Sequence, residues 1–385
     1  MQLAQRCQHI SPFQVIQVLK QVVALEAQGK DVIRLFVGEP DFSASPAILE
    51  AATQSIARDN QGYISSTGLA PLKEKIAQRY QRWHGLNIDP ARIIITPGGS
   101  AALQLAFLAL VNSGDEVLLP EPGYPCNSNL LHMVDATSRR VFMDEKNAMA
   151  LSMSALQYAT NEKSKALLIA SPSNPLGTVQ SLEQWQEISA FCKKNDIALI
   201  ADEIYHGLVF EGLAPTALEA DDNAWVIQSF SKFYGMTGWR LGWLVVPDHA
   251  IGACERIAQN LYLSASSIAQ YAALRCFDED VEAESFAKRD ELKKRRDYLM
   301  TALPKIGLNI MANPDGAFYL YLDVSPYTND SLAWCAHVLN ETGVALAPGA
   351  DFGGPSPNTT ARLAYTVNVE RLTEAVERLN AFLNK

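Results

Sequence analysis

Lys232 and the polar residues around it form the segment of this chain with the clearest capacity for chemistry. The lysine ends the string Ser229-Phe-Ser-Lys232, and Arg240 follows eight residues later within Gly-Met-Thr-Gly-Trp-Arg-Leu-Gly. An unprotonated lysine amine attacks an aldehyde, and a nearby guanidinium lowers the pKa of the ammonium. A hydroxyl and a guanidinium together bind a phosphate group. The spacing therefore indicates a site for a phosphate-bearing aldehyde, with a lysine on an exposed loop as the alternative.

Asp202 is the second residue with a specific chemical interpretation. It follows four apolar residues in Ala198-Leu-Ile-Ala-Asp202-Glu-Ile-Tyr205. A carboxylate buried behind such a run is costly unless it meets a cation, and a protonated pyridine nitrogen is such a cation. The carboxylate would keep the ring positive, so that the ring accepts electrons from a substrate carbon. Tyr205 could then hydrogen-bond the phenolic oxygen of the ring, whereas the alternative role for Asp202 is a helix N-cap.

Four further segments could complete one site, although each has an ordinary structural explanation. The turn Thr96-Pro-Gly-Gly-Ser-Ala101 enters an apolar helix and would present free backbone N–H groups to an anion. Tyr124, within Pro-Gly-Tyr-Pro, could stack on an aromatic ring, and Asn174, between prolines, could donate to a ring oxygen or a carboxylate. Arg362 has the fork geometry that suits an amino acid's carboxylate. Taken singly, the glycine turn could be an ordinary strand–helix turn and Tyr124 a core tyrosine. Asn174 could be an ordinary turn residue, and Arg362 could pair with a carboxylate of the protein itself. Together with Lys232 and Asp202 they predict an enzyme that uses pyridoxal phosphate.

The elements that must position these residues have an α/β pattern. Between residues 90 and 246, short apolar runs alternate with helical patterns, including helices over 100–111, 153–160 and 182–194. The predicted strands are 92–96, 116–119, 139–142, 166–170, 198–202, 225–229 and 242–246. Their continuous apolar character predicts a mostly parallel seven-stranded sheet covered by helices. The candidate residues lie where these strands end, which is where such sheets bind ligands.

The remainder of the chain predicts a smaller α+β unit. A charged helix over 281–302 precedes strands near 308–311, 317–322 and 361–366, with helices over 331–340 and from 370 to the end. The amphipathic segment 13–28 is expected to pack with this unit. We therefore divide the chain into an N-terminal segment (1–45), a large domain (46–275) and a small C-terminal domain (276–385).

Composition excludes several classes of function. The 385 residues are 48% hydrophobic and carry 32 basic against 42 acidic side chains, a net charge of −10, which argues against nucleic acid or an anionic membrane as the main partner. The six cysteines are scattered and form no C-x-x-C pair, which indicates reduced thiols. The histidines show no H-x-x-x-H spacing, so the sequence does not predict a zinc site. Without a secretory signal pattern or an apolar run of roughly 18 residues, a cytoplasmic location is expected.

Five of these motifs, in the same order, resemble those of the class I/II aminotransferases of the aspartate aminotransferase superfamily. The resemblance extends from Val37-Gly-Glu-Pro-Asp-Phe42 to Arg362, nearly the whole chain. It implies a fold type I transferase dependent on pyridoxal 5'-phosphate, assembled as a homodimer with active sites at the interface. The implied reaction moves an amino group between an L-amino acid and a 2-oxo acid by a ping-pong mechanism.

The resemblance also implies a role for individual residues. Lys232 would form the imine with the cofactor, Asp202 would pair with the pyridine nitrogen, and Tyr205 would complete the catalytic set. The implied cofactor-binding residues are Lys232, Asp202, Tyr205, Asn174, Tyr124, Ser229, Arg240, the backbone of Ser100 and Ala101, and Tyr63 from the opposite subunit. The implied residues for the substrate carboxylate are Arg362, Asn174 and the backbone near Gly38.

The chain departs from the family pattern in ways that bear on specificity. Ser171 and Leu176 replace an Asn and a Thr that the family often has, which leaves the mechanism intact. Ser100-Ala101 lacks the lysine or glutamine that many relatives place in this turn, so no second cation is evident for a dicarboxylate substrate. The candidates Tyr63, Tyr124 and Phe352 favour large apolar or aromatic amino acids. The alternatives left open are a carbon–sulfur β-lyase on the same fold, a Ser-x-x-Lys acyl hydrolase using Ser229, and a non-catalytic regulator.

Overall fold

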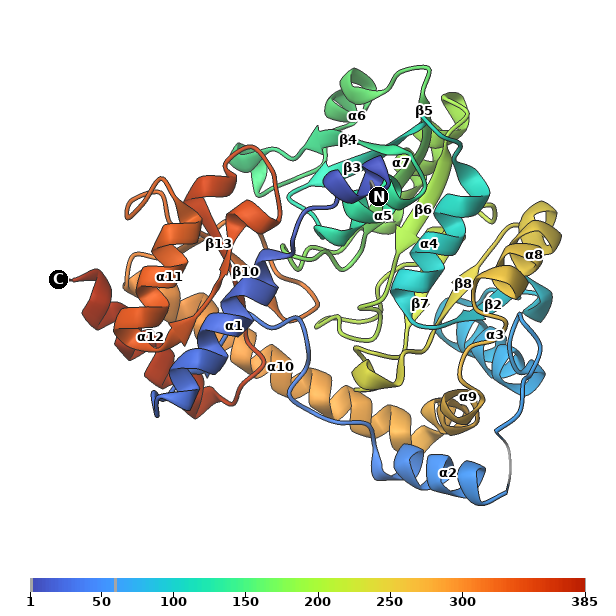
Figure 1. The fold of residues 1–385 in the computed structure, drawn as a ribbon, viewed down its shortest axis with the longest axis horizontal. Coiled ribbons are helices and arrows are strands. Elements are labelled where there is room, and N and C mark those ends of the chain that lie inside the picture. The colour runs from blue at the N-terminus through green and yellow to red at the C-terminus, as the bar shows by residue number, and fades with distance from the viewer. Residues whose placement is uncertain (1–2, 59–60, 385) are drawn as a thin grey trace.

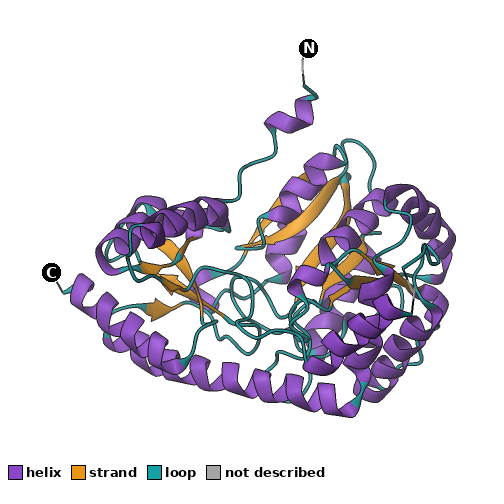
Figure 2. Cartoon of the chain, turned by 60° about the horizontal axis from the view of Figure 1, so that its bottom comes forward, coloured by secondary structure: helices purple, strands orange, loops and turns teal. Residues whose placement is uncertain are grey.

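The computed structural model describes residues 3–58 and 61–384 and consists of two parts. The larger part is built on a seven-stranded sheet, and the smaller part combines the C-terminal elements with the first helix of the chain (Figure 1). The long helix α10 (Glu279–Lys305) runs from one part to the other, and Figure 2 shows it extending beneath both. Within the part of the chain that the structure describes, no helix has the length and apolar character needed to cross a bilayer.

The seven-stranded sheet confirms the predicted α/β fold. Its order is β2-β8-β7-β6-β5-β3-β4, and all neighbours are parallel except that β8 runs antiparallel to both β2 and β7. The strands are β2 (Ile93–Thr96), β3 (Glu116–Glu121), β4 (Thr137–Phe142), β5 (Ser164–Ala170), β6 (Ala198–Asp202), β7 (Trp225–Ser229) and β8 (Gly242–Val245). Strand β3 continues two residues beyond its predicted end because its pairing with β4 extends to Glu121.

Helices cover both faces of this sheet, because successive side chains of a strand point to opposite faces. Ile94, Ile200 and Leu244 pack with α4 and α8 on one face, whereas Ile93, Leu199 and Trp243 belong to the larger core on the other. The helices of this part are α2 (Pro46–Ala57), α3 (Ala70–His84), α4 (Gly99–Leu110), α5 (Cys126–Met133), α6 (Met153–Ala159), α7 (Leu182–Lys194), α8 (Ile251–Leu261) and α9 (Ser267–Ala273). The capping box at Ser181, whose side chain accepts from the Gln184 amide, starts α7 at its predicted residue.

The smaller part is a four-stranded antiparallel sheet with helices packed against it. The sheet has the order β12-β13-β10-β9, and a separate parallel pair joins β1 to β11. The elements are α1 (Gln14–Ala27), β1 (Ile33–Arg34), β9 (Asn309–Ile310), β10 (Tyr319–Asp323), α11 (Ser331–Thr342), β11 (Val344–Ala345), β12 (Ala347–Pro348), β13 (Thr360–Ala364) and α12 (Val369–Leu383).

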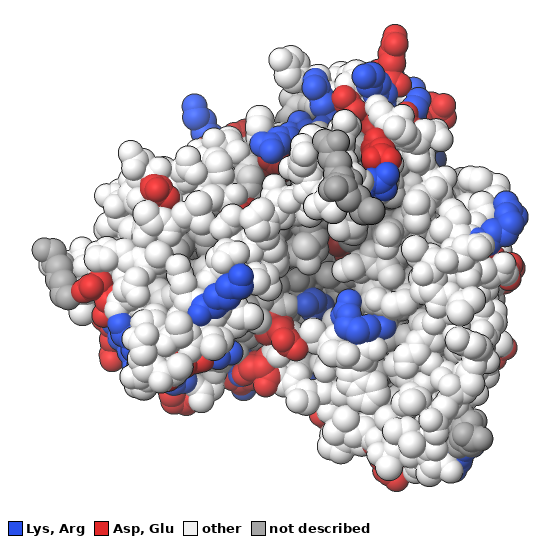
Figure 3. All heavy atoms as spheres, in the orientation of Figure 1, with Lys and Arg blue, Asp and Glu red and all other residues white. Residues whose placement is uncertain are grey.

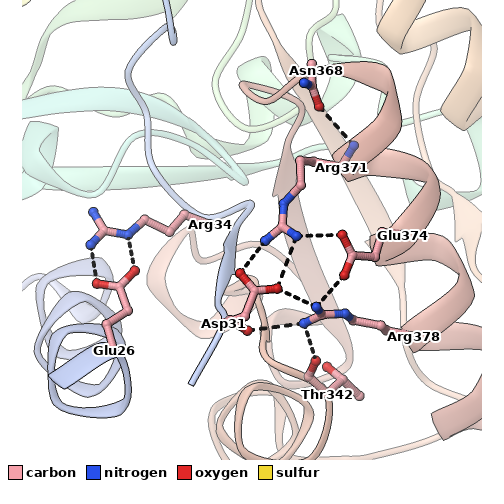
Figure 4. Close-up of polar contacts among 8 residues, drawn as sticks. All are labelled: Glu26, Asp31, Arg34, Thr342, Asn368, Arg371, Glu374 and Arg378. Carbon is pink, nitrogen blue, oxygen red and sulfur yellow. Dashed lines mark hydrogen bonds and ion pairs between the residues drawn. The ribbon is translucent and has the colours of Figure 1, made fainter. Parts of the chain in front are cut away.

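The N-terminal segment is attached to this smaller part by apolar and ionic contacts. Val15 and Val22 of α1 are buried in one cluster with Tyr321 and Leu339. Asp31 accepts hydrogen bonds from two arginines of α12, and one of them also donates to the carbonyl of Thr342 (Figure 4). These contacts fit the predicted packing of the first 45 residues, while the domain boundaries themselves stay a prediction.

Candidate active site

A candidate anion-binding corner forms where β2 and β7 end and β8 begins. The strand register places both Thr96 and Ser229 opposite Gly242, so the two strand ends meet beside the start of α4. A Cβ on Gly242 would lie 3.0 Å from the Gly99 nitrogen, and a Cβ on Gly98 would lie 2.6 Å from Nη2 of Arg240. Only glycine therefore lets this arginine and the helix N-terminus approach so closely. Free first-turn amides, a hydroxyl and a guanidinium converge as a phosphate group requires.

Replacing Gly98 by alanine is expected to weaken binding of inorganic phosphate at this corner by about tenfold or more. Gly98 has φ +86°, which strains any residue with a Cβ, and the new methyl group would displace the Arg240 guanidinium. Calorimetric titration measures the affinity. Gly238→Ala is the matched control, because its φ is unstrained and a Cβ added there would have no described atom within 4 Å. Equal affinity in Gly98→Ala and the wild type would contradict this assignment.

Lys232 lies in the connection between β7 and β8, and its amine is held inside the site. Nζ donates to the carbonyl oxygen of Gly38 at 2.7 Å. Burial, together with the nearby guanidiniums of Arg362 and Arg240, lowers the pKa of the ammonium to about 8, although the carboxylates of Glu39 and Asp202 act in the opposite direction. About a tenth of the amine is thus uncharged at pH 7, against less than about a thousandth for an ordinary lysine, and the uncharged amine is the form that nucleophilic attack requires.

Asp202 ends β6 and is a buried carboxylate in need of a cation. Its side chain is 5% exposed, and burial raises its pKa to about 6. The amide of Ile204 donates to Oδ1 at 3.3 Å, and no ion pair within residues 3–58 and 61–384 includes this carboxylate, although the more distant charge of Lys232 lowers its pKa. No helix begins directly after Asp202 in the described chain, so the alternative role as a helix N-cap is not realised, and the single contact to the Ile204 amide, which lies within a turn, does not offset the buried charge. A positively charged group bound next to Asp202 would offset that charge.

Arg362 and Asn174 form the third group of the site. Nη1 of Arg362 donates to Oδ1 of Asn174 at 2.8 Å, and Nη2 donates to the carbonyl of Phe36 at 2.7 Å. The guanidinium lies over the rings of Tyr319 and Phe352, with its Nε buried and without a partner among the described residues. No carboxylate pairs with it in that part of the chain, so it is available to an anionic ligand.

The remaining predicted residues lie at the edge of the site or outside it. Tyr124 is half-buried, meets Phe13 edge-on at 6.1 Å, and lines a cavity of about 340 Å³ together with Phe352. Tyr63 is 85% exposed, so the structure does not bring it into the site of its own chain. The face drawn in Figure 3 is hollowed between the two parts of the molecule, and both basic and acidic side chains lie in or beside the hollow.

Several groups that shape the site were not predicted from the sequence. The hydroxyl of Tyr205 is bonded at 2.8 Å to that of Tyr319, a residue that reads as an ordinary core position within a strand. The carbonyl of Phe36 orients Arg362, but backbone groups carry no signal in the residue type. Gly242 opens β8 as predicted, but the strand pattern did not indicate its second role, which is to admit the backbone of Gly99.

Glu203 lies directly behind the site in a buried polar layer. Its carboxyl accepts from Thr216, from the Ala217 amide and from Gln228, and His206 Nδ1 lies 3.4 Å away. Burial raises the pKa of Glu203 to about 8 and lowers that of His206 well below its usual value, so both are neutral at pH 7. The next acidic residue after Asp202 is therefore structural.

Replacing Glu203 by glutamine is expected to stabilise the protein at alkaline pH. Because the folded state holds the proton up to about pH 8 and the unfolded chain releases it near 4.5, the wild type loses stability as the pH rises between these values. Urea unfolding at pH 5.0 and 8.5 should show the wild type losing a few kcal/mol more than Glu203→Gln. Parallel losses in both proteins would show that Glu203 is ionised in the fold.

Comparison with known proteins identifies the class to which this fold and site belong. The model of the family "Aminotransferase class I and II" matches residues 30–379. A valine–pyruvate aminotransferase of Mycobacterium tuberculosis is 35% identical over 97% of both chains, and a (5-formylfuran-3-yl)methyl phosphate transaminase of Methanocaldococcus jannaschii is 36% identical over the full length of both. A crystal structure of an aminotransferase from Mycobacterium tuberculosis superposes with a TM-score of 0.96 at 34% identity, over 100% of this chain and 99% of the other.

The chain belongs to the class I and II aminotransferases. It is an enzyme that transfers amino groups between amino acids and oxo acids, which supports the main prediction over the lyase alternative. The fold type I architecture is likewise confirmed. Enzymes of this family use pyridoxal phosphate, and the residues present fit that group, because the buried Asp202 has no ion-pair partner among the described residues and the corner at Gly98 suits a phosphate.

Proposed function

We propose that this aminotransferase binds pyridoxal 5'-phosphate covalently through Lys232. Ser229, Arg240 and the amides of Ser100 and Ala101 would hold its phosphate at the N-terminus of α4. Asp202 would pair with the pyridine nitrogen, Tyr205 and Asn174 would contact the ring oxygen, and Tyr124 would stack on the ring. The observation that carries the proposal is the convergence of a buried amine, a buried carboxylate in need of a cation and an anion-binding corner at one end of the sheet.

The chain's own residues account for the proton transfers. When bound, the cofactor supplies an electron sink for the electron pair left at the substrate Cα. Once the amino group of the substrate has displaced Lys232 from the cofactor, the freed amine would be placed to take the Cα proton and to give a proton back on the cofactor side, and its pKa of about 8 suits both acceptance and release. Asp202, which is kept from solvent, would hold the ring nitrogen protonated.

Arg362 would bind the substrate α-carboxylate. Its buried Nε, which has no partner among the described residues, and its fixed orientation between Asn174 and the Phe36 carbonyl give a ready-made site for a carboxylate. The backbone near Gly38 would lie on the other side of that group.

The side chain of the substrate would enter the cavity beside Tyr124 and Phe352. These two rings and that of Phe13 form its aromatic walls, and the arginine that lines it, Arg140, already lies 3.5 Å from Glu121. We therefore favour large uncharged side chains over dicarboxylates. The relatives compared above are named for valine–pyruvate and for a furan phosphate, so the family itself does not fix this choice.

The working enzyme would be a homodimer located in the cytoplasm. Tyr63 stands exposed on the single chain, as expected of a residue that reaches the phosphate of the opposite subunit. Sedimentation measures the assembly directly.

Borohydride reduction followed by peptide mapping tests the proposal. The expected result is a cofactor label on Lys232 alone. Single-turnover mixing with a panel of amino acids should then give an oxo acid from at least one of them. A label on another residue, or no label, would overturn the proposed attachment.

A further inference from the structure

We propose that Tyr319 is a positioning residue that connects Arg362 with Tyr205 and directs the Tyr205 hydroxyl toward the cofactor. This inference rests on the proposed function, and it assigns a role to a side chain that the sequence motifs do not include.

Tyr319 contacts three parts of the site, namely Tyr205, Arg362 and the backbone at Gly38. It is fully buried on β10, and its hydroxyl lies 2.8 Å from that of Tyr205. The guanidinium of Arg362 stands 4.4 Å from the centre of its ring. A Cβ added to Gly38, whose carbonyl accepts from Lys232, would lie 2.9 Å from the Tyr319 hydroxyl. One side chain thus contacts the carboxylate-binding arginine, the cofactor-facing tyrosine and the backbone that holds the catalytic lysine.

The hydroxyls of Tyr205 and Tyr319 carry two hydrogens, and only one of them is used in the hydrogen bond between them. Burial raises the pKa of both phenols, so both stay protonated at neutral pH. If Tyr319 donates to Tyr205, the hydrogen of Tyr205 is left free for a second acceptor. Since hydrogen bonds in a chain polarise one another, accepting from Tyr319 also makes Tyr205 a stronger donor. A phenolic oxygen on the bound cofactor is the acceptor that the proposed function supplies.

The strand register explains why this arrangement is rigid. Tyr321 pairs directly with Arg362 across β10 and β13, and Tyr319, two residues along the strand, is on the same face. Its ring therefore lies beneath the guanidinium, where cation–π attraction holds it. Tyr205 belongs to the larger part of the molecule and Tyr319 to the smaller sheet, so this hydrogen bond joins the two parts within the site.

Tyr319→Phe tests the proposal because it removes the hydroxyl and keeps the ring. With Tyr205 a weaker donor, the cofactor oxygen attracts a neighbouring proton more strongly. The pH midpoint of the bound cofactor's visible absorbance should therefore rise by about half a unit to one unit, and kcat should fall about tenfold. The KM for amino acids should change less than about twofold, since the phenylalanine ring still supports Arg362. Tyr319→Leu, which removes the ring too, should raise KM as well.

Tyr321→Phe is the matched control. It lies on the same strand, is also buried, and loses a comparable hydrogen bond, 2.7 Å to Thr360. It should lower the melting temperature about as much as Tyr319→Phe, without moving the absorbance midpoint. An unchanged midpoint in Tyr319→Phe, with Lys232 still labelled by borohydride, would overturn this inference and leave the proposed function standing. Absence of the label on Lys232 would instead overturn the proposed function.

Discussion

Replacing Lys232 by alanine is expected to lower the rate of the half-reaction with an amino acid by about four orders of magnitude or more. The change removes both the covalent attachment and the amine held at the Gly38 carbonyl. Stopped-flow mixing of the variant with an amino acid, with oxo-acid product quantified over hours, measures the residual rate. Equilibrium dialysis should still detect bound cofactor, because the phosphate corner and Asp202 are unchanged.

Lys232→Arg separates the loss of charge from the loss of a titrating amine. The guanidinium keeps the positive charge but does not release its proton at any accessible pH, so this variant should be as inactive as the alanine variant. A small primary amine added in solution should restore part of the activity of Lys232→Ala and none of that of Lys232→Arg, because arginine fills the space. Activity within tenfold of the wild type in either variant would contradict the assignment of Lys232.

The fold was predictable because its strands are continuous apolar runs bounded by glycine, proline and polar residues. β6 and β7 lie at their predicted residues, since nothing in Ala198–Asp202 or Trp225–Ser229 competes with a buried strand. The ends of β3 and β4 were less predictable because they depend on pairing with one another, a contact between distant parts of the sequence. The antiparallel direction of β8 has the same origin: direction is set by where the connection carrying Lys232 returns.

The site was predictable where function demands a particular residue type, and not where it uses common types or backbone. Lys232, Asp202 and Arg362 are charged residues next to apolar runs, and the structure brings Asp202 and Arg362 close enough to Lys232 for their charges to shift the pKa of its amine. Tyr319 has no such contrast, because an aromatic residue within a strand is the usual content of a core. Tyr63 is a different case: its predicted role belongs to a second subunit, which a single chain does not contain.

Replacing Asp202 by asparagine is the other change with a large expected effect, a loss of about a thousandfold in the half-reaction rate. Asparagine has nearly the same shape and can still accept the hydrogen bond from the Ile204 amide, so the substitution isolates the charge. Without that charge the ring nitrogen loses its proton, and the electron sink weakens. Single-turnover mixing measures the rate. A wild-type rate in Asp202→Asn would show that Asp202 has only a structural role.

In the cofactor-free protein, Asp202→Asn should increase the free energy of unfolding, although it lowers the reaction rate. Burial raises the pKa of Asp202 from 3.8 to about 6, so the wild type loses stability as the pH rises through that interval, by up to about 3 kcal/mol in total. Asp202→Asn has no such loss and should be the more stable protein at pH 7.5, while the two should be alike at pH 4. Urea unfolding of both proteins at the two pH values measures this difference.

Loading the cofactor should reverse the order at pH 7.5, because the ring nitrogen then supplies the missing cation. If the asparagine variant were the more stable one with and without cofactor, the carboxylate would have no cationic partner in the site, and the role proposed for Asp202 would be wrong.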